Sequence, residues 1–194
     1  MQTFPAMTRL LAVCLGLLLP GLALAHTGDH LHLQNGFLSG LLHPLSGWDH
    51  LLAMITLGLL AGLHQGRMQL LLPACFLVAL LGGYLAGLAG VILPWFEVGI
   101  AASLLIFGLL VTSRLRLPAA GLLFLAAGFA AFHGSAHGVE AVGNSLGFGL
   151  GLLLASLLLH LTGVMIARSA LGSFPLALRG AGVAVSCTGL LLLI

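Results

Sequence analysis

The stretch that decides the fold is His43-Pro44-Leu45-Ser46-Gly47-Trp48-Asp49-His50. It places two imidazoles and a carboxylate inside a run of residues that is otherwise largely apolar. Ionisable side chains at membrane depth are costly to bury, and by default they mark substrate or ion pathways. A second polar stretch follows later in the chain, Phe132-His133-Gly134-Ser135-Ala136-His137-Gly138-Val139-Glu140. We therefore expect the two stretches to form one site inside a membrane protein.

The composition excludes a water-soluble fold. The 194 residues are 60% hydrophobic and 5% charged, with a mean hydropathy of +1.22, whereas a soluble domain carries about 25% charged residues. Six basic residues and four acids give a net charge of +2, which is too small to indicate a nucleic-acid partner. Histidine is unusually frequent among the polar residues, with nine copies against four acidic residues. The composition therefore indicates a lipid bilayer as the surroundings of the chain.

Residues 1–25 have the pattern of a cleaved secretory signal peptide. Arg9 precedes a short apolar run, and Ala23-Leu24-Ala25 matches a small-residue cleavage site. The apolar run is short for a membrane span, which takes about 20 residues, although an uncleaved signal anchor stays open. Cleavage would leave residues 26–35 as a histidine-rich tail that begins with His26. Such a tail either collects metal or is a plain surface segment.

Residues 36–194 predict an all-α membrane bundle of six transmembrane helices. The apolar segments are 36–63, 68–90, 95–112, 118–136, 141–167 and 175–194. A cleaved signal puts the mature N-terminus outside, and alternate connections then face the cytoplasm. Those connections carry the arginines Arg67, Arg114, Arg116 and Arg168. The charge distribution follows the positive-inside rule, which supports both the signal and the number of spans.

The first apolar segment is predicted to be broken near His43-Pro44. Proline removes a backbone donor and disfavours helix at the residue before it. The segment is also too long to cross a core of about 30 Å as one untilted helix. Broken helices are typical of transporter binding sites. A second half starting near Leu45 would place Asp49 and His50 close to its N-terminus, whereas a continuous helix would align His43, Gly47, His50 and Met54.

The second polar stretch has the spacing of a metal site on one helix. His133, His137 and Glu140 stand at i, i+4 and i+7 and share one helix face. A histidine pair at i, i+4 can offer two imidazoles to one metal ion. Gly134 and Gly138 would let a partner helix come close. Imidazole with carboxylate suits nickel, copper(II), zinc or cobalt(II). None of the cysteines (Cys14, Cys75, Cys187) forms a CxxC pair that would suggest a thiolate site.

The candidate metal ligands are His43, Asp49, His50, His133, His137 and Glu140, with His26 as a further candidate in the tail. Asp49 either binds the metal directly or orients a histidine through its ring N–H. Because all these ligands together would hold an ion too tightly for release, we expect some of them to serve adjacent stations. His160 is interpreted as an interhelical hydrogen-bond donor, and Met54 and Met165 as packing residues.

At these residues the sequence resembles the HupE/UreJ family of bacterial nickel permeases. The family pattern His-x5-Asp-His is matched by His43, Asp49 and His50. The pattern Phe-His-Gly-x-Ala-His-Gly-x-Glu is matched by Phe132, His133, Gly134, Ala136, His137, Gly138 and Glu140. A histidine directly after the signal, as His26 is here, also fits. The resemblance covers the whole chain, including the signal and the six spans.

The resemblance implies secondary transport of nickel, with cobalt as the alternative cargo, for hydrogenase or urease maturation. It implies a permease of the bacterial inner membrane whose mature N-terminus is periplasmic, and not an enzyme. The metal would be the transported substrate, with no permanently bound cofactor. The sequence has no Walker motif that would indicate ATP binding. It leaves the oligomeric state open, a homo-oligomer included.

Three other functions use the same residues. A metal-binding membrane sensor or chaperone would bind without transport, which uptake into proteoliposomes would distinguish. A membrane haem protein would use histidines of neighbouring spans as axial ligands, but the clustered acids fit this poorly, and a visible absorption spectrum tests it. An intramembrane zinc enzyme is disfavoured because Gly134 stands where the H-E-x-x-H motif has glutamate.

Overall fold

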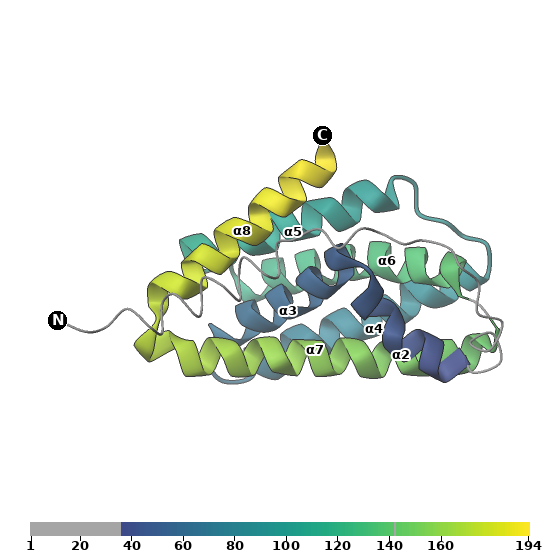
Figure 1. Ribbon diagram of the computed structural model, residues 1–194, viewed down its shortest axis with the longest axis horizontal. Coiled ribbons are helices and arrows are strands. Elements are labelled where there is room, and N and C mark those ends of the chain that lie inside the picture. The colour runs from purple at the N-terminus through teal and green to yellow at the C-terminus, as the bar shows by residue number, and fades with distance from the viewer. Residues whose placement is uncertain (1–35, 142) are drawn as a thin grey trace. The chain divides into compact units, whose positions relative to one another are not determined.

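The structure, a computed structural model, describes residues 36–141 and 143–194, and these are helical apart from short connections (Figure 1). The helices are α2 Gly36–Ser46, α3 Trp48–Gly62, α4 Met68–Leu88, α5 Phe96–Ser113, α6 Ala119–Glu140, α7 Ser145–Ser173 and α8 Pro175–Leu193. In this part of the chain, five helices are long and apolar enough to cross a membrane, or six if the bent pair α2 and α3 forms one span. The predicted all-α class is confirmed. The predicted signal peptide and the 26–35 tail lie outside the described residues.

The first span is bent by 83° between α2 and α3. The predicted break in this span is confirmed, but it falls at Gly47, three residues after Pro44, because α2 continues through Pro44 and ends at Ser46. The hydroxyl of Ser46 donates to the carbonyl oxygen of His43 at 2.6 Å in this last turn. Gly47 is extended, with φ −106° and ψ 119°. The bend rules out a continuous helix through both histidines.

The second polar stretch lies entirely within a helix. The predicted span 118–136 ended inside this stretch, but α6 continues to Glu140. His133, His137 and Glu140 therefore share the helix that the spacing predicted. In the connection that follows, Gly143 adopts a left-handed φ of 70°, a conformation that glycine reaches without strain. The next helix begins at Ser145, because the side chain of Asn144 caps it by accepting from the backbone N–H of Gly147.

Glycines bring α4 and α6 into backbone contact. A Cβ atom at Gly83 would overlap the carbonyl oxygen of Ala131, and one at Gly87 would lie 2.7 Å from the carbonyl oxygen of Ser135. On the facing helix, Gly134 and Gly138 have equally little room against α4. Such small-residue faces are the usual means of close helix packing in lipid. The prediction that Gly134 and Gly138 allow close approach is confirmed.

Glycines also join the bent first span to α7. A Cβ atom at Gly40 of α2 would overlap the backbone of Phe148, and one at Gly58 of α3 would overlap the carbonyl oxygen of His160. Helix α7 therefore runs along both halves of the span and supports the bend from one side (Figure 1). Helix α5 packs against α8 as a further pair.

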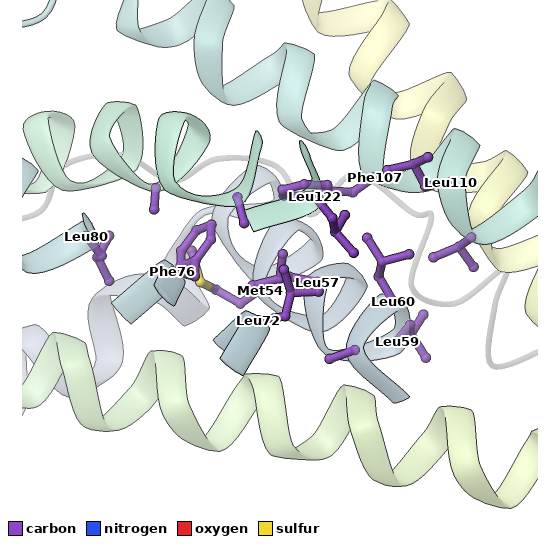
Figure 2. Packing of buried hydrophobic residues seen from close by; sticks show 14 of the residues in the cluster. Met54, Leu57, Leu59, Leu60, Leu72, Phe76, Leu80, Phe107, Leu110 and Leu122 are labelled. Atoms are coloured by element: carbon purple, nitrogen blue, oxygen red, sulfur yellow. The ribbon is translucent and has the colours of Figure 1, made fainter. Parts of the chain in front are cut away.

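The space between α3, α4, α5 and α6 is filled by apolar side chains (Figure 2). Met54 and Phe76 are fully buried there, beside residues that include Leu57, Leu60, Leu72, Phe107, Leu110 and Leu122. Met54 is thus a packing residue, as expected, whereas Met165 is 70% exposed and lies outside the core. The polar stretches occupy a small part of an otherwise hydrocarbon-like interior.

Adjacent glycines on α4 test the role of close packing. Gly83→Ala should destabilise the protein by about 1–3 kcal/mol, because its methyl group overlaps the backbone of α6. Gly82→Ala is the matched control, since nothing lies within 4 Å of a Cβ atom there. Thermal unfolding of both variants in detergent measures the difference. Equal melting temperatures for the two would contradict the packing of α4 on α6.

Candidate metal site

The bend between α2 and α3 lies against the last turns of α6, and four histidine rings form a chain across this contact. The ring of His43 on α2 lies 4.9 Å from that of His137 on α6, measured between centroids. His50 on α3 lies 4.3 Å from His137 and 5.1 Å from His133. The bend thus directs the two histidines of the first span toward the two of α6.

Within this chain, two groups of three side chains could each hold one metal ion. The first group is His50, His133 and His137, and the second is His43, His137 and Glu140. The candidate ligand atoms of each group lie within 4.8 Å of one another. Ligand atoms about 2.1 Å from one ion are at most about 4.2 Å apart, so a small closure would complete either group. Because the groups share His137, they would form adjacent stations for an ion.

Ser103 of α5 fixes the tautomer of His133. Its hydroxyl donates to the carbonyl oxygen of Ile100 at 2.6 Å and lies 3.0 Å from His133 Nε2. Because the only hydrogen of the hydroxyl is donated to Ile100, the hydroxyl oxygen must accept a hydrogen bond from the Nε2–H group of His133. In the neutral ring the lone pair then lies on Nδ1, which is buried and has no hydrogen-bond partner among the described residues. Metal-binding histidines are commonly held in this way.

Asp49 orients His50 in the same manner. Its Oδ1 accepts from His50 Nδ1 and from the backbone N–H of His50, both at 2.9 Å. The ring proton therefore lies on Nδ1, which leaves the lone pair on Nε2. That nitrogen is buried and unpartnered in the described part of the chain. Asp49 belongs to neither ligand group. Of its two predicted roles, the geometry favours orienting a histidine. Gly47 leaves space for this pair, since its Cβ atom would lie 2.9 Å from Asp49 Oδ1.

The two stations differ in burial. Glu140 Oε2 lies 3.0 Å from His43 Nε2 and 3.5 Å from His137 Nδ1. The side chains of His43 and Glu140 are 28% and 47% exposed, whereas His137 is fully buried. In the other station the His50 side chain is 11% exposed and His133 is fully buried. An ion from outside would therefore first meet the group with Glu140, called here the carboxylate station (His43, His137 and Glu140). It would next meet the all-histidine station, which consists of His50, His133 and His137.

The structure brings together the side chains predicted from both polar stretches, which are His43, His50, His133, His137 and Glu140. Asp49 contacts this site through its hydrogen bond to His50. His26 lies outside the described residues. Ser103 was missed, because a single serine in an apolar helix gives no signal until the packing of α5 on α6 is known. The interpretation of His160 as a hydrogen-bond donor is wrong within the described residues, where neither ring nitrogen has a partner.

Comparisons with known proteins cover nearly the whole chain. The family model described as HupE / UreJ protein matches residues 12–192. Protein HupE of Rhizobium leguminosarum bv. viciae is 36% identical over 181 residues, which are 92% of this chain and 93% of that protein. No solved structure gives a significant match. The family match includes the bent span and α6, which carry the candidate site.

Removal of the Ser103 hydroxyl should weaken metal binding. In Ser103→Ala, the His133 ring loses the acceptor that fixes its tautomer, so we expect nickel affinity to fall about tenfold. Equilibrium dialysis of nickel against the detergent-purified protein measures this. Ser113→Ala is the control, because that exposed serine of α5 donates to its own helix at Leu109, away from both ligand groups. Unchanged affinity in Ser103→Ala would refute the assigned tautomer.

Asp49→Asn separates the two roles of Asp49. An asparagine oxygen can still accept from His50 Nδ1, so an orienting residue predicts binding about tenfold weaker but with the same number of bound ions. His50→Ala, the comparator, removes an imidazole and should lose the all-histidine station. Nickel titrations followed by calorimetry report both quantities. Loss of binding in Asp49→Asn as complete as in His50→Ala would show direct ligation instead.

Proposed function

The chain belongs to the HupE/UreJ family, and on that premise we propose that it is a permease that carries nickel ions across the bacterial inner membrane. The family resemblance supports nickel as the cargo, with cobalt as the alternative, and a supply of metal for hydrogenase or urease maturation. The metal is the substrate, so the protein needs no resident cofactor and catalyses no covalent reaction.

The observation that carries this proposal is a buried group of three imidazoles with free lone pairs next to a more exposed group. Nickel is well suited to imidazole ligands. Three protein ligands leave coordination positions open, whereas structural metal sites are closed by four. An ion held in this way can exchange between ligands. Adjacent stations that share His137 allow stepwise transfer, which a permease needs and a storage site does not.

The donor set also restricts the metal. Cys75 and Cys187 lie outside both ligand groups. Imidazole and carboxylate without thiolate favour a divalent ion over copper(I). Between nickel and cobalt the ligands make no distinction, and the family resemblance supports nickel.

The proposed direction of transport is inward, with the site near the periplasmic side. Arg67, Arg114 and Arg116 lie in connections between helices at the end of the bundle opposite the last turn of α6 (Figure 1). The positive-inside rule assigns that end to the cytoplasm. We propose that six spans, α2 with α3 as the first, follow a cleaved signal at 1–25. The periplasmic 26–35 tail, with His26, would then deliver metal to the carboxylate station.

Nickel uptake into proteoliposomes tests the function. Wild-type protein should accumulate the ion, whereas His50→Ala and His133→Ala should fall to background because each removes an imidazole from the all-histidine station. His64→Ala is the control, since His64 lies outside both ligand groups, in the connection after α3, where its Nδ1 bonds to the carbonyl oxygen of Leu60. Uptake at the wild-type rate by both site variants, at equal protein level, would contradict the proposed function. Binding without uptake in the wild type would indicate a sensor or chaperone.

A further inference from the structure

His160 is a buried imidazole that the site described so far does not use. It lies near the middle of α7, is fully buried, and has no partner for either ring nitrogen among the described residues. Buried polar groups are almost always hydrogen-bonded, and each exception calls for an explanation. An interhelical hydrogen bond, the ordinary role of an intramembrane histidine, does not account for it.

Ser156 repeats the anomaly one turn away on the same face of α7. Its side chain is also fully buried, and its hydroxyl has no partner in the part of the chain that the structure describes. Residues at i and i+4 lie one above the other on a helix. Two unpartnered polar groups in succession therefore line α7, in a region whose other side chains form an apolar core.

The position of His160 continues the chain of histidine rings inward. Phe148 of α7 contacts the ring of His43, with centroids 5.2 Å apart, and so marks the level of the carboxylate station. His160 follows Phe148 by twelve residues, which is about 18 Å along a helix. Ser156 lies between the two levels. On the proposed topology, this direction leads away from the periplasmic side.

Phe76 of α4 connects His160 to the all-histidine station. Its ring lies 5.1 Å from that of His160 and 5.9 Å from that of His133, measured between centroids. One aromatic ring thus separates the innermost histidine of the site from the next free imidazole.

We propose that His160, with Ser156 beside it, is a third and deeper metal station, which the ion reaches from His50, His133 and His137 past Phe76. This inference rests on the proposed function. Nickel or cobalt(II) suits an imidazole with additional oxygen ligands from a hydroxyl or water. A station with few protein ligands holds the ion weakly, as release toward the cytoplasm requires.

Uptake and binding measured on the same variant test the role of His160. His160→Gln should lower the initial rate of nickel uptake into proteoliposomes about tenfold or more, while nickel binding at the outer stations, measured in detergent, changes less than about twofold because their imidazoles are intact. Leu158→Cys, an outward-facing change on α7, is the control. Wild-type uptake by His160→Gln overturns the inference alone, whereas absence of uptake by the wild type overturns the proposed function.

A spectroscopic readout keeps the test independent of transport and of folding. Cobalt(II) added to purified His160→Cys should give a near-ultraviolet thiolate-to-cobalt charge-transfer band, because the new thiolate replaces an imidazole ligand. Wild-type protein and Leu158→Cys, which have the same native cysteines, should lack the band. Retained binding at the outer stations shows that the variant is folded. With those stations saturated, absence of the band in His160→Cys would contradict a metal station at this position.

Discussion

The cost of burying an imidazole nitrogen without a hydrogen-bond partner is the constraint on which the rest of the structure depends. In a lipid-surrounded bundle each such atom loses its bonds to water, at about 1–3 kcal/mol. Yet His50, His133 and His137 concentrate several of these atoms in one place. The surrounding apolar packing and the glycine contacts between helices must offset this cost. A metal ion that binds the free lone pairs, as the proposed cargo would, offsets this cost while it is bound.

Two devices hold the lone pairs in position. The bend at Gly47 turns the first span so that its two histidines meet α6 from different directions. Second, Asp49 and Ser103 each accept a hydrogen bond from one ring N–H, so the opposite nitrogen of His50 and of His133 is left free. The close glycine contacts of α4 with α6, and of α7 with the bent span, keep the backbones near enough for this geometry to persist.

Much of the fold follows from the apolar segments and their breaks, because a membrane span has a fixed length and the arginines mark its ends. The histidines of α6 could be predicted as neighbours because their spacing on one helix determines that. Other features depended on contacts between helices. The break was predicted near Pro44, but α2 continues through Pro44 to Ser46, and the bend falls at Gly47. Neither Ser103 nor the unpartnered state of His160 has a local signature.

On the proposed function, imidazoles of the bent span and of α6 bind the ion together. X-ray absorption spectroscopy at the nickel edge, on purified protein loaded with one equivalent of nickel, tests it most directly. We expect only nitrogen and oxygen neighbours, with the multiple-scattering pattern of about three imidazole rings, as the all-histidine station supplies. Sulfur coordination, or a spectrum of hydrated nickel without imidazole scattering, would contradict it.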